Sequence, residues 1–220
     1  MPTSFHHTIS KILDLIIFVD PKSVLDIGVG FGKYGMLCRE YLEVWGRDTG
    51  YGSFTRVIDG VEAFPQYLTP LHSYVYNKVY QGDARDVIGT LPRRYDLVIL
   101  IDVLEHFTKP EGTALVHDLL RRNGMVLVST PKEFMEQHDT FENPFETHLS
   151  HWSKRDFRML GPGMFLHDRD CWIVLLGEEA SMSSLKRSYF VQKYKQRLAR
   201  LPLVLATYHA VRRWARPKNA

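Results

Sequence analysis

Apolar residues recur at regular spacings along the chain, and the spacing alternates between that of helices and that of strands. From Ile9 to Ile17 the apolar positions follow helical spacing, which predicts a first helix that ends near Val19, before Pro21. Five later apolar runs are short and bounded by turn residues, as is typical of buried strands. The predicted strands cover residues 23–28, 56–61, 75–80, 95–101 and 124–129.

Helical patterns separate these strands. The predicted helices cover residues 34–45, 65–74, 110–122 and 153–160. Pro65 suits the first turn of a helix, where no N–H is needed, and Ser153 is a favourable N-cap residue. Strand and helix therefore alternate along most of the chain.

The run 95–101 is apolar throughout, as expected of a central parallel strand that is covered on both faces. Near the end, residues 165–166 and 171–176 are apolar and polar residues separate them, which predicts a closing hairpin. The pattern therefore predicts the α/β class, with a doubly wound, mostly parallel Rossmann-like sheet and a C-terminal antiparallel hairpin. Ligands of such sheets bind at the carboxyl ends of the strands, so the chemistry is expected there.

The composition is that of a globular protein with one main core. The chain has 220 residues, of which 45% are hydrophobic. Its only cysteines are Cys38 and Cys171, so no disulfide framework is expected and a cytoplasmic location is predicted. Lys11 and Asp14 interrupt the apolar stretch 9–19, which argues against a signal peptide or a membrane span there.

Charge divides the chain into a predicted domain, residues 1–180, and a basic tail, residues 181–220. No Asp or Glu follows Glu179, and the tail carries ten of the 28 Lys and Arg residues, which leaves 18 basic against 25 acidic residues before it. Apolar residues between Leu201 and Trp214 suggest a basic amphipathic helix, and Pro202 restarts it. Such a helix predicts peripheral contact with an anionic membrane surface. A solvated helix packed on the domain and a contact with nucleic-acid phosphates are the alternatives.

The first predicted strand runs into a loop with three evenly spaced glycines, Asp26-x-Gly28-x-Gly30-x-Gly32. Glycine lets the backbone turn sharply and lets a ligand approach closely. The spacing differs from the dinucleotide fingerprint, in which two residues separate the last two glycines. The loop therefore indicates a ligand site of another kind.

Acidic residues follow the next two predicted strands. Glu62 ends the second strand, and its carboxylate can accept hydrogen bonds from both hydroxyls of a ribose. The third strand runs into Gly82-Asp83-Ala84, where Asp83 can accept from an adenine amino group and the adjacent backbone can donate. The order of these residues at successive strand ends predicts an adenosine site.

With these motifs, residues 20–176 resemble the class I S-adenosylmethionine (SAM)-dependent methyltransferases, whose first motif is similar to residues 24–32. The resemblance implies that SAM is the cofactor, with its methionine end at the glycine loop, its ribose at Glu62 and its adenine at Asp83 and Ala84. The cofactor-binding residues predicted in this way are Asp26, Gly28, Gly30, Gly32, Glu62, Asp83, Ala84 and Asp102.

The fourth strand is followed by Asp102-Val-Leu-Glu105-His106, and a long aromatic loop, residues 131–152, adds further histidines and acids. Carboxylates with imidazoles make a candidate site for Mg²⁺, Mn²⁺ or Fe²⁺. These segments are similar to the ubiquinone-pathway O-methyltransferases and to the small-RNA 3′-terminal 2′-O-methyltransferases. That resemblance implies the metal ligands Asp102, Glu105, His106 and His148, although this chain has the shorter Asp at the first position.

A metal-free reading assigns the same segments to acid–base chemistry. His106, His148 or His151 would orient or deprotonate the methyl acceptor, and Glu105 completes the predicted catalytic set. A third interpretation is structural, with His148 and Trp152 fixing the loop to the sheet.

Three function classes follow from the sequence. The first is transfer of the SAM methyl group to an oxygen or nitrogen of a small-molecule, sugar or lipid-linked acceptor, favoured by the aromatic loop. The second is an RNA methyltransferase with a divalent metal, suggested by the metal-like motif and the tail but not by the acidic domain. The third is a SAM-binding protein without catalysis.

Overall fold

The computed structural model describes residues 4–45 and 52–199. The chain divides into two compact units, Met1–Glu179 and Ala180–Ala220, and each is described by itself. The predicted tail helix between Leu201 and Trp214, with its restart at Pro202, lies outside the described residues.

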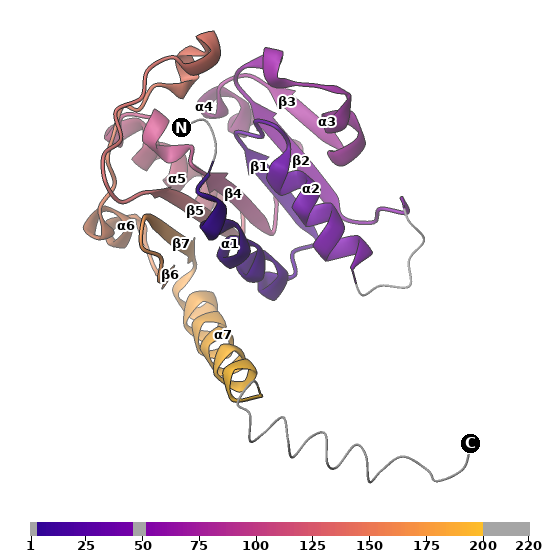
Figure 1. Cartoon of the computed structure of the whole chain (residues 1–220), viewed down its shortest axis with the longest axis vertical. Helices are drawn as coiled ribbons and strands as arrows, with labels where there is room; N and C mark the ends of the chain where they lie inside the picture. Colours follow the sequence, from indigo (N-terminus) through magenta and orange to yellow (C-terminus); the bar gives the residue numbers. More distant parts are fainter. Residues whose placement is uncertain (1–3, 46–51, 200–220) are drawn as a thin grey trace. The chain divides into compact units, whose positions relative to one another are not determined.

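The first unit is built on one seven-stranded sheet with the order β3-β2-β1-β4-β5-β7-β6 (Figure 1). The strands are β1 (Ser23–Ile27), β2 (Val57–Glu62), β3 (Lys78–Gln81), β4 (Leu97–Ile101), β5 (Met125–Pro131), β6 (Gly163–Leu166) and β7 (Cys171–Gly177). β1 to β5 pair in parallel, whereas β7 is antiparallel to both β5 and β6. The predicted doubly wound sheet with a closing antiparallel hairpin is confirmed.

Helices cover both faces of this sheet (Figure 1). They are α1 (His6–Val19), α2 (Lys33–Arg39), α3 (Pro70–Val75), α4 (Ala84–Val87), α5 (Lys109–Arg122) and α6 (Lys154–Leu160). α1 contacts α2 and α2 contacts α3, while α4, α5 and α6 share the core on the other face. β4 is buried at every position between these layers, which agrees with its continuous apolar run.

Three predicted elements differ from the structure. The predicted helix 65–74 is broken into a 3₁₀ turn, Pro65–Tyr67, and α3, because Thr69 precedes Pro70 and is extended, with φ −129°. α3 continues to Val75, so β3 begins at Lys78 and not at residue 75. The C-terminal half of the predicted helix 34–45 is a π-helix, Glu40–Val44.

Candidate active site

The glycine loop after β1 depends on backbone angles that favour glycine. Gly28, Gly30 and Gly32 have φ of 76°, 49° and 79°, in the left-handed region. A Cβ atom on Gly28 would lie 2.6 Å from Val103 Cγ2, whereas Gly30 borders open space. The loop is therefore both tightly packed behind Gly28 and accessible in front of Gly30.

Two neighbouring elements hold this loop in place. The Gly30 N–H donates to the Glu62 carboxylate at 3.0 Å, and the Gly30 carbonyl accepts from His72 Nε2 at 2.8 Å. His72 Nδ1 accepts from the Thr69 N–H at 3.0 Å, so Nε2 carries the proton that it donates to Gly30. His72 was not among the predicted site residues, and only its place in the Thr69 capping box marks it in the sequence.

Asp26 lies beneath the loop and not on the surface of the cavity. It is buried, and its carboxylate accepts a 2.6 Å hydrogen bond from the Tyr76 hydroxyl. Burial raises the pKa of Asp26 to about 7, with the Tyr76 hydrogen bond opposing the shift. Asp26 therefore does not line the cavity, and its contact with the cofactor remains a prediction.

A cavity of about 440 Å³ opens at the carboxyl ends of the parallel strands. Of the predicted cofactor residues, those that line it are Gly28, Gly30, Glu62, Asp83, Ala84 and Asp102. Glu105, His106 and His148 line the same cavity. Six of the predicted cofactor residues and three of the predicted catalytic residues thus share one space, as expected at this edge of a doubly wound sheet.

The acidic residues of the adenosine side are already oriented by hydrogen bonds. Glu62 accepts from the N–H groups of Gly30 and Phe64, and burial raises its pKa. Asp83 is the N-cap of α4, and both of its carboxylate oxygens accept from the Arg85 guanidinium, at 3.0 and 2.6 Å. Burial alone would raise the pKa of Asp83, but the hydrogen bonds from Arg85 lower it. Asp83 is therefore an ionised acceptor.

Asp102 occupies a strained position just after β4. Its φ is 55°, which is uncommon for a residue with a side chain. Its carboxylate accepts a 3.2 Å hydrogen bond from the Ser129 hydroxyl, although burial still raises its pKa. Ser4, which precedes α1, also lines the cavity.

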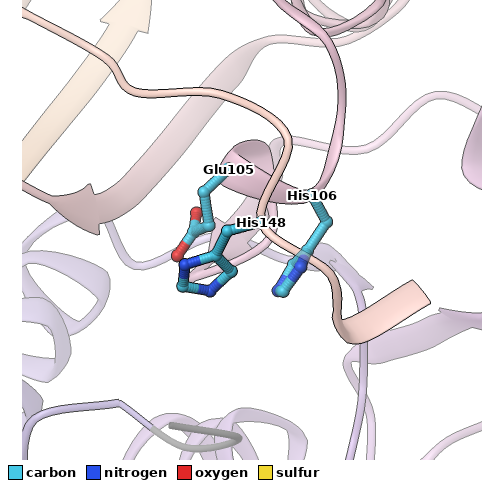
Figure 2. A group of neighbouring side chains, drawn as sticks. All are labelled: Glu105, His106 and His148. Atoms are coloured by element: carbon cyan, nitrogen blue, oxygen red, sulfur yellow. The ribbon is translucent and has the colours of Figure 1, made fainter. Parts of the chain in front are cut away.

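Glu105, His106 and His148 come together although the last two lie 42 positions apart in the sequence. Each offers one ligand atom, and these atoms lie within 4.8 Å of one another. Figure 2 shows the three side chains extending into the same space, with the Glu105 carboxylate beside the His148 ring. The imidazole centroids of the two histidines are 4.9 Å apart.

Backbone contacts bring the long loop to this cluster. The N–H groups of Leu149 and Ser150 both donate to the Glu105 carbonyl, at 2.8 and 3.1 Å. Trp152 is buried, and its Nε1–H donates to the Leu104 carbonyl and to the Ser150 hydroxyl. Trp152 therefore fixes the loop to the sheet, while His148 lines the cavity.

The hydrogen bonds define the tautomer of both histidines. Nδ1 of His106 bonds the Thr147 carbonyl at 3.1 Å, and Nδ1 of His148 bonds the Met135 carbonyl at 2.5 Å. A carbonyl can only accept, so each Nδ1 carries the proton and each Nε2 keeps a lone pair. Burial lowers the pKa of both rings, which keeps them neutral at neutral pH.

The unsatisfied carboxylate oxygen of Glu105 is the strongest indication that the cluster binds a proton, a cation or a substrate hydroxyl. Glu105 is buried, and its Oε2 has no hydrogen-bond partner among the described residues. Burial and the nearby Asp102 carboxylate raise its pKa well above the ordinary range. A proton, a cation or an acceptor hydroxyl would satisfy this oxygen.

Other predicted or candidate residues lie apart from the cluster. His151 is exposed, and its Nε2 bonds the Lys132 carbonyl. His138 is exposed beside Glu136, and Gly32 is the N-cap of α2. The described residues that line the cavity do not include His151, His138 or Gly32.

An aromatic wall, defined here as Phe31, Tyr67 and Phe145, completes the cavity. The rings of Phe31 and Tyr67 stack at 6.3 Å, and Phe31 is 72% exposed. The Tyr67 hydroxyl donates to Glu146 at 3.1 Å. Phe31 and Tyr67 were missed in the sequence because isolated aromatic residues in loops carry no spacing signal.

A comparison with known proteins matches residues 4–161 to a family described as a methyltransferase domain. No curated protein sequence matches the chain. One similar solved structure is the N-terminal domain of EvdMO1 in the presence of S-adenosylhomocysteine and D-fucose, with a TM-score of 0.54 and 16% identity over 79% of this chain and 83% of that chain.

Two further structures share the fold. An O-methyltransferase family protein from Burkholderia thailandensis has a TM-score of 0.53 and 12% identity, over 78% of this chain and 55% of that chain. The methyltransferase domain of bacterial CtHen1 has a TM-score of 0.50 and 17% identity, over 76% of this chain and 95% of that chain. At these identities the likeness is one of fold.

Proposed function

The chain belongs to the class I SAM-dependent methyltransferase family, and we propose that it methylates an oxygen or nitrogen of a small-molecule, sugar or lipid-linked acceptor. The observation that carries the proposal is the single cavity that the cofactor residues share with Glu105, His106 and His148. Its aromatic wall offers flat apolar faces on which a compact acceptor can lie.

In the proposed reaction, the acceptor heteroatom attacks the methyl carbon in line with the carbon–sulfur bond. That bond breaks as the new one forms, the sulfonium becomes a neutral thioether, and the acceptor loses a proton. The sulfonium already activates the methyl group, so the chain contributes mainly alignment. The lone pair on Nε2 of His106 or His148 can receive the proton, since both imidazoles are neutral.

The cluster also fits a divalent cation such as Mg²⁺, Mn²⁺ or Fe²⁺. Metal-binding histidines are commonly oriented by a hydrogen bond from the other ring nitrogen to a backbone carbonyl, and His106 and His148 both have one. The unpaired Oε2 of Glu105 supplies a third ligand. Asp102, the fourth predicted ligand, is not in this group. A bound ion would lower the proton affinity of the acceptor oxygen.

The first test is replacement of Glu105 and His148 together by Ala. We expect methyl transfer to fall by at least about 100-fold, because the double variant loses the unpaired carboxylate and one proton acceptor. SAM affinity should change by less than about threefold, since neither residue lies on the adenosine side. Transfer of a labelled methyl group and calorimetric SAM binding measure the two effects.

His138→Ala is the matched control, because His138 is an exposed histidine of the same loop. It should keep wild-type turnover. Wild-type turnover in the Glu105→Ala/His148→Ala protein would exclude these residues from the reaction.

The acceptor class is tested by adding the protein and methyl-labelled SAM to cell extract. Label in the small-molecule or lipid fraction supports the proposal. Label in RNA would favour the second candidate, an RNA methyltransferase, which the Glu105–His106–His148 group supports. SAM binding without transfer to any fraction would identify a SAM-binding protein without catalysis.

A further inference from the structure

The second unit contains α7 (Glu179–Ala199), which exposes an apolar face. Phe190, Val191, Tyr194 and Leu198 are 49%, 48%, 64% and 38% exposed. Residues at these spacings share one side of a helix. Two aromatic and two aliphatic side chains therefore form a continuous exposed stripe, the apolar stripe of α7.

Basic side chains accompany this stripe. Arg187 and Lys195 lie four residues before and after Val191, and Lys186 lies four residues before Phe190; all three are exposed. No acidic residue follows Glu179 anywhere in the chain. The stripe is therefore combined with positive charge that no later acidic residue offsets.

We propose that α7 lies on an anionic lipid surface, with the apolar stripe at the boundary between headgroups and acyl chains. Long basic side chains can extend from such a helix to lipid phosphates and carboxylates. None of the helices among the described residues has the length and apolar character of a membrane span. The basic residues after position 199 add to the attraction through their charge alone.

Two other occupants fit the stripe less well. A second copy of α7 would bring basic residues against basic residues, with no acidic partner after Glu179. A nucleic acid would satisfy the basic residues but would leave Val191 and Leu198 without an apolar partner. A lipid surface satisfies both the charge and the stripe.

The test is sedimentation of the full-length protein with vesicles. Binding to phosphatidylcholine vesicles with about 30% phosphatidylserine should exceed binding to pure phosphatidylcholine at least about tenfold. Binding should fall steeply at about 0.5 M salt, because salt screens the attraction. Equal binding to both vesicles would overturn the proposal.

Two variants test the basic residues and the apolar stripe of α7 separately. Lys186→Glu/Arg187→Glu/Lys195→Glu and Phe190→Ser/Tyr194→Ser/Leu198→Ser should each weaken binding at least about tenfold. The control reverses three exposed charges of the first unit, Arg93→Glu/Arg155→Glu/Arg158→Glu, and should bind as the wild type does. Circular dichroism shows whether each variant is folded.

Wild-type vesicle binding by either α7 variant would overturn the proposal. So would RNA binding in a gel-shift assay without vesicle binding, because it would identify a nucleic-acid surface. Failure of the methyltransferase assay would leave this test unaffected, since lipid binding is read without an acceptor.

Discussion

His72 is a positioning residue for the cofactor loop. It is buried, it belongs to the Thr69 capping box, and its Nε2–H donates to the Gly30 carbonyl. Gly30 borders the open space of the cavity. The hydrogen bond therefore connects α3 to the backbone that the cofactor would contact.

His72→Phe should weaken SAM binding about tenfold, because the Gly30 carbonyl loses its donor while the ring volume is retained. The turnover number at saturating SAM should stay near the wild-type value, since His72 is outside the catalytic cluster. His72→Gln keeps an N–H donor and should recover part of the affinity. Calorimetry and steady-state kinetics give the two quantities.

His117→Phe is the control for this prediction, because His117 is exposed on α5. A fall in thermal stability with unchanged SAM affinity in His72→Phe would assign His72 a structural role only.

The buried Asp26 carboxyl makes stability depend on pH. Its pKa is raised to about 7 in the folded chain, mainly by burial, so folding favours its protonated form. The protonated Asp26 therefore contributes to the stability of the fold. This contribution is complete below the ordinary Asp pKa of about 4 and is lost as the pH rises through about 7. Asp26→Asn removes this titration but can still accept from Tyr76.

The melting temperature of Asp26→Asn relative to the wild type should therefore rise between pH values of about 4 and 8, without SAM. Thermal unfolding across this range measures the difference. A constant difference would show that Asp26 does not titrate as described.

At the scale of elements, Asp168 connects the β6–β7 hairpin to α1. Its buried carboxylate accepts from Lys11 at 2.7 Å and from the N–H groups of Asp170 and Cys171. Burial alone would raise the pKa of Asp168, but these hydrogen bonds hold it well below its usual range. The ion pair thus helps to place the antiparallel edge of the sheet.

Asp168→Asn should lower the free energy of unfolding by about 1–2 kcal/mol, a modest figure because Lys11 is partly exposed. The ionised Asp168 carboxylate contributes to the stability of the fold above the ordinary Asp pKa, and this contribution is lost as the pH falls towards its lowered pKa. The stability difference should therefore shrink below a pH of about 4. Denaturant titrations at several pH values measure it. The control is Asp118→Asn, which removes an acidic partner of the surface ion pair with Arg121.

At the scale of the whole molecule, the sequence predicted the sheet well because its signals are local. The apolar run of β4 is a stretch of consecutive residues, and the acidic residues of the predicted adenosine site lie at or just after the ends of their strands. The interruption of the predicted helix at Thr69 follows from Pro70, a neighbour whose effect outweighs the apolar spacing.

The rest of the site depends on contacts between distant residues. The sequence named His148, but contacts between distant residues determine where it lies. Leu149 and Ser150 bond the Glu105 carbonyl, and Nδ1 of His148 bonds the Met135 carbonyl. His72 and Tyr67 reach the site from the segment after β2. The Thr69 capping box marks His72 only as a residue at a helix start, and no motif marks Tyr67. The predicted catalytic role of His151 remains a prediction, and its ring lies apart from the cluster.

The main-chain attachment of the long loop has an evolutionary consequence. Because the Glu105 carbonyl is bonded by the N–H groups of Leu149 and Ser150, the anchor of His148 is largely indifferent to which side chains stand earlier in the loop. Exposed residues such as Phe134 and Phe141 can then be exchanged without displacing the imidazole. The sequence of that stretch can therefore vary while the imidazole keeps its place beside Glu105.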